Sequence, residues 1–226
     1  MVSPLCTIPL FNLFYSILPF MKNLKLNNKF YPSKIPSKKL MIILHGRGDS
    51  SDGFTWLPPY LKLEDMNYLL LDAPYEYFGG RSWYGMAPDQ EEGIIASSKI
   101  LTEILDELFE EEFQASQSFL FGFSQGSLLT FEFGGRYHKT LAGYIAISGY
   151  IYDAEKLLIE MNPKVKEAKW LCTHGTSDGV LPYATSKAQV ETLQEGGFDI
   201  AFKTYDKDHT IVEEELGMIR EWMKNI

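Results

Sequence analysis

The chain has 226 residues, of which 45% are hydrophobic and 23% are charged. This composition is typical of a globular protein with a substantial core, and the length fits one domain. The formal net charge of -9 excludes a nucleic-acid partner, because proteins that bind phosphate backbones usually present a basic patch.

The first twenty residues, MVSPLCTIPLFNLFYSILPF, carry no charged side chain. They lack the positive start and small-residue cleavage site of a secretory signal. Pro9 and Pro19 also interrupt a run that is barely long enough to span a membrane. Residues 1–21 are therefore an apolar arm, a weak export signal or an extension ahead of a start at Met21. We favour the extension, followed by one domain over residues 22–226.

The two cysteines, Cys6 and Cys172, are too few and too far apart to indicate a disulfide framework or a zinc site. This cysteine usage favours a reducing compartment, and we expect a cytoplasmic protein. Cys172 reads as a small buried residue on a strand.

From Leu40 onward, short apolar runs bounded by turn residues alternate with helical patterns. The clearest helices are predicted over 91–113 and 210–223, where apolar side chains recur on one face. The alternation predicts a mainly parallel sheet with helices on both faces. Ligands bind beyond the carboxyl ends of such strands, so the residues that follow each strand are the candidates for a site. Strands are predicted over 40–44, 68–71, 118–123, 142–147, 169–173 and 200–205.

The strand at 40–44 is followed by HGRGDSSDG. Its two glycines allow a sharp turn that brings backbone N–H groups close to a ligand, as in an anion-stabilising loop. The Arg-Gly-Asp tripeptide within it is interpreted as coincidence, because it lies where a strand reaches the ligand-binding edge of the sheet.

The strand at 118–123 leads into Gly122-Phe123-Ser124-Gln125-Gly126. A nucleophile elbow turns so sharply from strand to helix that only small residues fit two places on either side of its serine. The start of the following helix also stabilises negative charge. A G-x-S-x-G pattern alone is common, but its place between a strand and a helix indicates that Ser124 is a nucleophile.

A serine nucleophile needs a histidine base and an acid that orients it, and after this elbow the acid precedes the histidine. His45 belongs to the glycine loop, His138 to a helix end and His174 to a strand end, and all three precede the best acid. His209, between the last strand and the last helix, is therefore the predicted base.

The predicted acid is Asp178, in the loop HGTSDGVLP. This loop follows the strand at 169–173, so its carboxylate can reach the same edge of the sheet as Ser124. Asp206 and Asp208 lie too close to His209 in the sequence to orient its ring from the far side.

Taken in order, LHGRGD, RSWYG, GFSQGS, ISGY, HGTSDGVLP and DHTI resemble the phospholipase/carboxylesterase branch of the α/β-hydrolases, which includes acyl-protein thioesterases. The resemblance covers Leu40 to the end of the chain. It implies a single α/β-hydrolase domain without a large lid and without a metal or other cofactor. It also implies a serine hydrolase that cleaves carboxylic esters or thioesters through an acyl-enzyme, as carboxylesterases, lysophospholipases and acyl thioesterases do.

Carried over residue by residue, the resemblance implies Ser124 as nucleophile, His209 as base and Asp178 as its partner. It also implies that the backbone N–H groups of Arg47 and Gln125 form the oxyanion hole. Two departures stand out. Asp208 replaces a glycine found in many relatives, which could alter the loop or the pKa of the histidine, and the apolar arm has no counterpart.

Trp83 matches a family tryptophan near the substrate site, although a core aromatic would look the same. Together with Tyr84 and Leu181 it could line an apolar pocket for a small-molecule or lipid-like acyl ester. An exposed apolar rim there could also form a homodimer contact or a membrane-facing patch. An esterase for small or aromatic esters and a binding protein on the same fold are the alternatives. The other pocket candidates are Trp56, Met86 and Tyr150.

Overall fold

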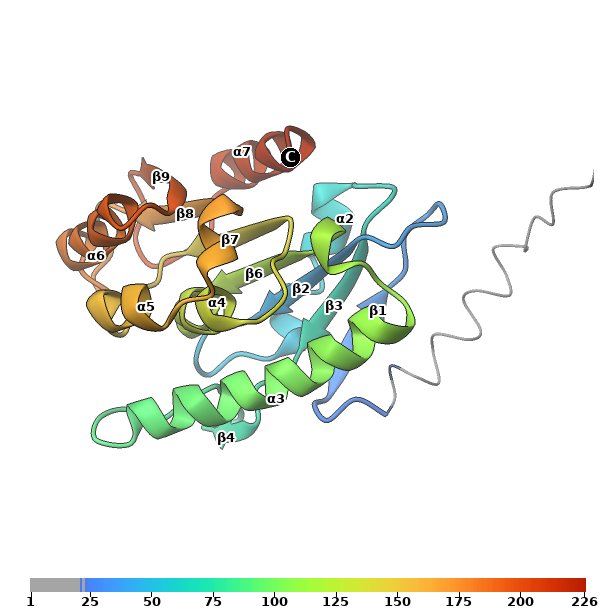
Figure 1. Ribbon diagram of the computed structural model, residues 1–226, viewed down its shortest axis with the longest axis horizontal. Helices are drawn as coiled ribbons and strands as arrows, with labels where there is room; N and C mark the ends of the chain where they lie inside the picture. The colour runs from blue at the N-terminus through green and yellow to red at the C-terminus, as the bar shows by residue number, and fades with distance from the viewer. Residues whose placement is uncertain (1–20, 22) are drawn as a thin grey trace, which may run out of the picture.

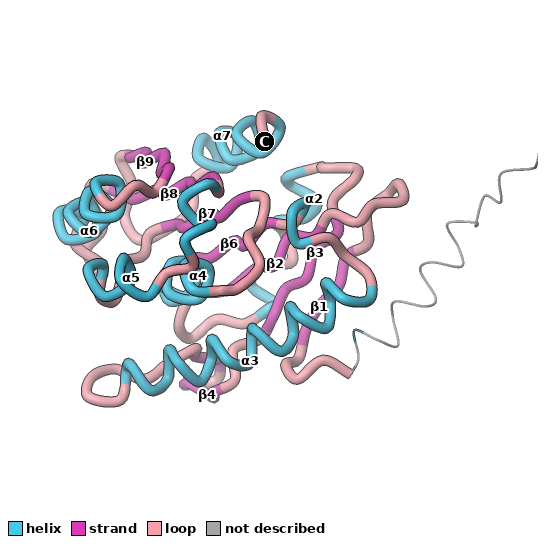
Figure 2. The backbone as a smooth tube through the Cα atoms, viewed as in Figure 1, coloured by secondary structure: helices cyan, strands magenta, loops and turns pink. Residues whose placement is uncertain are grey.

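The computed structural model describes residue 21 and residues 23–226, and residues 1–20 of the predicted arm lie outside this range. Its central layer is a seven-stranded sheet in the order β1-β3-β2-β6-β7-β8-β9 (Figure 1; Figure 2). All neighbouring strands are parallel except β1 and β3, which confirms the predicted mainly parallel sheet. The strands are β1 Asn28–Tyr31, β2 Leu40–Leu44, β3 Asn67–Leu71, β6 Phe119–Phe123, β7 Gly143–Ile147, β8 Lys169–Gly175 and β9 Asp199–Tyr205.

Helices cover both faces of this sheet (Figure 1). Side chains alternate across a strand, so Ile42 of β2 packs in the core layer under α3 to α6, whereas Ile43 packs in the layer under α2 and α7. The predicted helix at 210–223 begins at Glu213, and residues 210–212 belong to the loop before it. The helices are α2 Leu57–Leu61, α3 Gln90–Glu111, α4 Gln125–Arg136, α5 Ala154–Glu160, α6 Tyr183–Glu195 and α7 Glu213–Lys224, with short 3-10 turns η1 Ser51–Phe54, η2 Ala115–Gln117 and η3 Pro163–Glu167.

The polar segment that follows Met21 contains an edge strand that the sequence analysis did not predict. Its residues form β1, which pairs antiparallel with β3. Met21 itself is buried in the core under α3, so this residue packs with the domain although it was assigned to the arm.

A two-stranded hairpin, β4 Tyr75–Tyr77 and β5 Gly80–Ser82, was also not predicted. It packs against the glycine loop that follows β2. The Gly48 N–H donates to the Arg81 carbonyl and the Arg81 N–H donates to the Asp49 carbonyl, each at 2.8 Å. Phe78 at the hairpin tip is 95% exposed.

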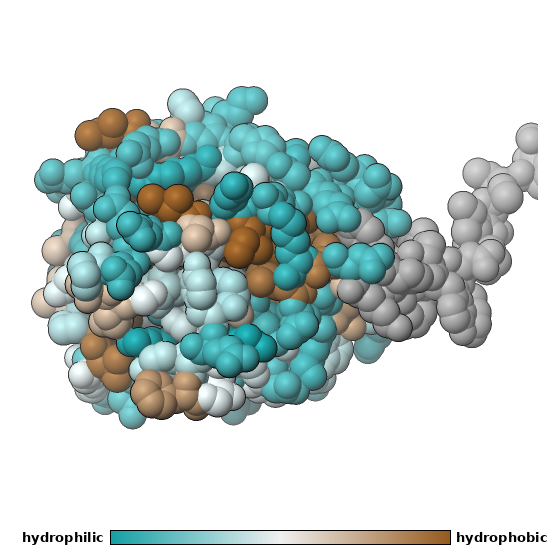
Figure 3. Space-filling view, turned by 90° about the horizontal axis from the view of Figure 1, so that it is seen from below, coloured by the Kyte–Doolittle hydropathy of each residue, from teal (hydrophilic) through white to brown (hydrophobic). Residues whose placement is uncertain are grey.

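Seen from the side on which α3 lies, the surface is mostly hydrophilic with separate apolar patches (Figure 3). Among the described residues, no helix combines the length and the apolar character needed to cross a bilayer.

Helix α4 lies unusually close to the sheet where it begins. A Cβ built on Gly126 would lie 2.1 Å from the Leu44 carbonyl oxygen, and one built on Gly122 would lie 2.1 Å from the Gly126 carbonyl oxygen. Real Cβ atoms do not approach backbone oxygens so closely, so both positions require glycine. These two glycines therefore set how near α4 comes to β2 and β6.

We expect Gly126→Ala to lower the free energy of unfolding by about 1–3 kcal/mol, because the added methyl group overpacks a backbone contact. Gly217→Ala in α7 is the matched control, because a Cβ there meets nothing within 4 Å, and it should stabilise the chain by up to about 1 kcal/mol. Urea unfolding followed by circular dichroism measures both. Equal effects of the two substitutions would contradict the close-packing argument.

Candidate active site

Ser124 occupies the tight turn between β6 and α4 with φ 54° and ψ -113°. A positive φ is uncommon for a residue other than glycine and marks a strained turn. The backbone holds this conformation from both sides, because the Ser124 N–H donates to the Ile147 carbonyl and the Leu128 N–H donates to the Ser124 carbonyl. The predicted elbow is therefore present, with its serine between the strand and the helix.

The structure brings Ser124, His209 and Asp178 together in one hydrogen-bonded chain. The Oγ of Ser124 lies 2.9 Å from Nε2 of His209, and Nδ1 of His209 lies 2.8 Å from Oδ2 of Asp178. With Nδ1–H donating to the carboxylate, Nε2 carries the lone pair that can accept the serine proton. The side chain of Asp178 is fully buried, whereas 17% of the His209 side chain is exposed.

The Asp178 carboxylate is held by the backbone of its own loop. Its Oδ1 accepts hydrogen bonds from the N–H groups of Val180 at 2.9 Å and Leu181 at 2.8 Å. Burial acts to raise the pKa of Asp178, but the hydrogen bonds from Leu181, His209 and Val180 outweigh it, and the pKa is lowered. The Asp178 carboxylate that bonds His209 is therefore ionised at neutral pH.

Two of the other histidines are buried and support neighbouring loops. His45 Nε2 accepts the Ala73 N–H at 3.0 Å while its Nδ1 lies 2.7 Å from the Gly46 carbonyl, and burial lowers its pKa. His174 Nε2 lies 2.9 Å from the Leu181 carbonyl, and burial lowers the pKa of this ring as well. Both rings are thus neutral and hold loops through hydrogen bonds: His45 holds the glycine loop, and His174 holds the Asp178 loop.

His138 is exposed and lies beside Asp106, with 3.1 Å between Nε2 and Oδ1, away from the triad as its place at a helix end suggested. Among the described residues, neither of the rival acids forms a hydrogen bond or an ion pair with the His209 side chain. Asp206 accepts a hydrogen bond from Ser177, and the side chain of Asp208 is exposed to solvent.

Two backbone N–H groups beside Ser124 are suited to stabilise an anion. Gln125 is the first residue of α4, where N–H groups have no partner within the helix. Within the described part of the chain, the Arg47 N–H donates to no backbone carbonyl. The Arg47 guanidinium stacks over the Tyr77 ring at 4.1 Å from its centroid, so the hairpin covers the loop that carries this N–H.

The Gln125 side chain has a role that the sequence analysis missed. Its Oε1 accepts the Trp83 N–H at 2.9 Å, and its Nε2 donates to the Tyr84 carbonyl at 2.7 Å. The Trp83 indole N–H in turn donates to the His45 carbonyl at 2.9 Å. One buried amide therefore links the elbow to the segment after the hairpin and, through Trp83, to the glycine loop. The sequence carries no signal for this link, because its partners lie about forty residues away.

The three residues predicted to contact substrate lie in different places. Trp83 is fully buried, so it braces the glycine loop and presents no surface to a ligand. Leu181 acts through its backbone, which bonds Asp178 and His174. Tyr84 is only 1% exposed but borders a pocket of about 530 Å³ together with Arg47 and Tyr77, so of the three predicted residues it is the one that lies at a pocket.

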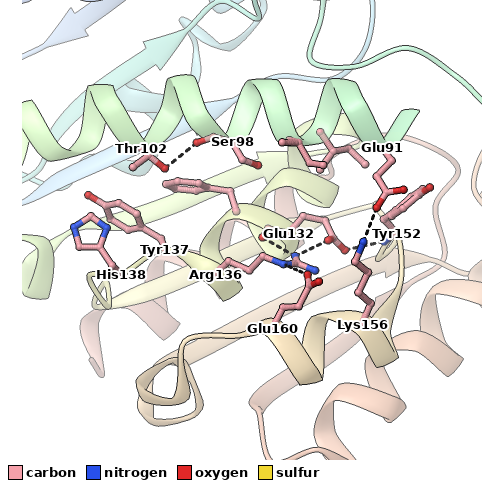
Figure 4. Close-up of a pocket in the computed structure, with 13 residues that line it drawn as sticks. Glu91, Ser98, Thr102, Glu132, Arg136, Tyr137, His138, Tyr152, Lys156 and Glu160 are labelled. Atoms are coloured by element: carbon pink, nitrogen blue, oxygen red, sulfur yellow. Dashed lines mark hydrogen bonds and ion pairs between the residues drawn. The ribbon is translucent and has the colours of Figure 1, made fainter. Parts of the chain in front are cut away.

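A separate groove of about 470 Å³ lies between α3, α4 and α5 (Figure 4). Its apolar floor includes Ile94 and Phe133. None of the described residues that line it was predicted for the site. Its charged side chains pair with one another, Lys156 with Glu91 and Arg136 with Glu132 and Glu160.

The sequence matches the family described as phospholipase/carboxylesterase over residues 28–226. It is 27% identical to carboxylesterase SOBER1 of Arabidopsis thaliana over 206 residues, which cover 83% of this chain and 90% of that protein. It is 28% identical to acyl-protein thioesterase 1 of Candida albicans over 214 residues, covering 84% and 93%. The crystal structure of esterase PE8 superposes with a TM-score of 0.81 at 25% identity, covering 89% of this chain and 99% of that one.

The lowered pKa of Asp178 predicts how stability depends on pH. A carboxyl group whose pKa is lower in the folded state stabilises the fold above its unfolded pKa of about 4, and this contribution is lost as the pH falls through the folded value. We therefore expect the difference in unfolding free energy between the natural chain and Asp178→Asn to be largest near neutrality. It should shrink as the pH falls below about 4.

Urea unfolding of both proteins at several pH values measures this difference. Asp208→Asn, which changes an exposed carboxylate of the neighbouring loop, is the matched control and should change stability by less than about 0.5 kcal/mol. A difference for Asp178→Asn that stays constant down to about pH 3 would contradict the ionised, hydrogen-bonded acid.

Proposed function

The chain belongs to the phospholipase/carboxylesterase family, and from this premise we propose that it is a serine hydrolase that cleaves carboxylic esters or thioesters through an acyl-enzyme. The observation that carries the proposal is the continuous hydrogen-bonded chain from Ser124 through His209 to Asp178. Its relatives include proteins named as carboxylesterases and as acyl-protein thioesterases, which supports the substrate class.

In the first step His209 Nε2 takes the proton of Ser124 as Oγ attacks the carbonyl carbon of the acyl group. Asp178 stays ionised and stabilises the imidazolium that forms. The carbonyl oxygen becomes an oxyanion, which the N–H groups of Gln125 and Arg47 stabilise. The dipole of α4, whose first residue is Gln125, adds favourable positive potential at the same place.

His209 then returns its proton to the leaving alcohol or thiol as the tetrahedral intermediate collapses, and the acyl group remains on Ser124. In the second half of the reaction a water molecule attacks this ester while His209 accepts a proton from it. The carboxylic acid leaves, Ser124 recovers its proton, and the enzyme returns to its starting state.

The cavity of about 530 Å³ beside Arg47 is the proposed location of the acyl chain. It is lined by Tyr75, Tyr77 and Tyr84 and, toward solvent, by Glu76, Asp89 and Glu92. Pockets of this size hold ligands of drug-like dimensions. The cytoplasm is the proposed location of the protein, in keeping with the free, buried thiol of Cys172. Contact with a lipid surface or a second copy through exposed side chains such as Phe78 and Met86 stays a prediction.

We expect a kcat/KM that depends on Ser124 and increases from p-nitrophenyl acetate to medium-chain esters, because the cavity offers an apolar wall for a longer acyl chain. Ser124→Ala should lose several orders of magnitude in kcat and should lose the single fluorophosphonate adduct seen by intact mass. A preference for acetate would favour a small-ester esterase. Absence of both turnover and adduct on folded protein would favour a binding protein on this fold.

Arg47→Pro tests the oxyanion donor, because proline removes the N–H at that position. Its kcat should fall by about a hundredfold or more, the usual cost of one oxyanion-hole donor. Arg47→Ala keeps the N–H while it removes the guanidinium stacked on Tyr77, so it is expected to lose far less. Similar kcat values for the two variants would show that the Arg47 N–H does not stabilise the oxyanion.

A further inference from the structure

A buried ion pair lies next to the loop that carries His209. The Lys207 ammonium lies 2.7 Å from each carboxylate oxygen of Glu215 and 2.7 Å from the Thr210 carbonyl oxygen. All three ammonium hydrogens therefore have acceptors. The side chains of Lys207 and Glu215 are 1% and 0% exposed, so the pair is shielded from solvent.

The Lys207–Glu215 pair links the backbone on the two sides of His209. Lys207 precedes His209 by two residues, and the Thr210 carbonyl that it binds follows His209 directly. Glu215, in the first turn of α7, also accepts the Val212 N–H at 3.3 Å. Contacts from one cluster of charges thus hold the loop on both sides of His209 and attach it to α7.

The same segment is fitted to the loop that carries the acid. The Lys207 carbonyl accepts the Ser177 N–H at 3.2 Å. A Cβ on Gly175 would lie 2.3 Å from the Lys207 carbonyl oxygen, so the two loops meet backbone to backbone. Any shift of the backbone at Lys207 would therefore change the placement of His209 relative to Asp178.

A buried ion pair contributes little net stability, because the cost of removing two charges from water offsets their attraction. Replacing such a pair with apolar side chains of similar volume is often neutral or stabilising. Its geometric effect is separable, because apolar side chains cannot bond the Thr210 carbonyl or the Val212 N–H. Stability and placement of the loop can therefore be measured independently.

We propose that Lys207 and Glu215 are positioning residues that hold the His209 loop so that Nε2 stays within hydrogen-bond reach of the Ser124 hydroxyl. This inference rests on the proposed function, in which His209 is the base. The two residues touch neither substrate nor reacting atoms, and they act through the backbone on either side of the histidine.

The test compares the natural chain with the double variant K207M/E215L, in which both charges are replaced by apolar side chains. Three quantities are measured: the rate of fluorophosphonate labelling of Ser124 by intact mass, kcat and KM for a p-nitrophenyl ester, and the midpoint of urea unfolding. We expect a midpoint close to that of the natural chain and an unchanged KM. The labelling rate and kcat should fall by about tenfold to a hundredfold, the scale of a base misplaced by about 1 Å.

Two single variants complete the comparison. Lys207→Arg keeps donors for both Glu215 and the Thr210 carbonyl and should retain most of the labelling rate. Lys39→Met removes an exposed ion pair with Asp65, in which the charged atoms lie 2.6 Å apart. This pair lies at the amino ends of β2 and β3, at the opposite end of the strands from the site. It should leave labelling and turnover unchanged.

A folded double variant that labels and turns over at the natural rate would overturn the positioning role while leaving the proposed function intact. If the double variant does not fold, Glu215→Gln gives the decision, because it keeps the shape of the side chain but replaces one of the two oxygens that bind Lys207 with an NH2 group that cannot accept a hydrogen bond. Its labelling rate should also fall, and a natural rate would overturn the inference. Failure of the natural chain to label at Ser124 would overturn the proposed function and this inference together.

Discussion

The contact between the start of α4 and the Leu44 carbonyl is the constraint on which the site depends. A side chain at Gly126 or Gly122 would overlap a backbone oxygen, with its Cβ only 2.1 Å away. Because both residues are glycine, α4 can start directly after β6 with only Ser124 between them. The turn forces Ser124 into a positive φ and leaves its Oγ at the carboxyl edge of the sheet. It also directs the free N–H groups of α4 to that edge and places the glycine loop after β2 beside them.

Asp178 and His209, which form the hydrogen-bonded chain with Ser124, come from loops that begin where β8 and β9 end, so sheet hydrogen bonds cannot hold them. Local polar contacts hold them in place. Two backbone N–H groups and the His209 ring donate hydrogen bonds to the Asp178 carboxylate, so this fully buried group can remain ionised. The Lys207 and Glu215 pair holds the histidine loop against α7. The precision of the site thus comes from polar groups buried beneath it.

The core strands and the meeting of Ser124, His209 and Asp178 could be predicted from the sequence because each has a local signal. Apolar runs mark β2, β3 and β6 to β9, and the order of serine, acid and histidine selects Asp178 and His209. Strand β1 and the hairpin gave no such signal, since NKFY and the short runs beside Gly79 are too brief to show a pattern. The bracing role of Trp83 was missed because an aromatic side chain reads alike in a core and in a pocket.

Gln125 connects the parts of the site that sequence reading treats separately. Its backbone N–H is the proposed oxyanion donor, and its side chain bonds the backbone of Trp83 and Tyr84. Tyr84 lines the proposed acyl cavity, and Trp83 bonds the His45 carbonyl at the base of the loop that carries the second donor. A displacement of the cavity wall must therefore either break a buried hydrogen bond, which is costly, or move an oxyanion donor. For this reason a substitution at Tyr84 that alters acyl-chain binding should also change kcat.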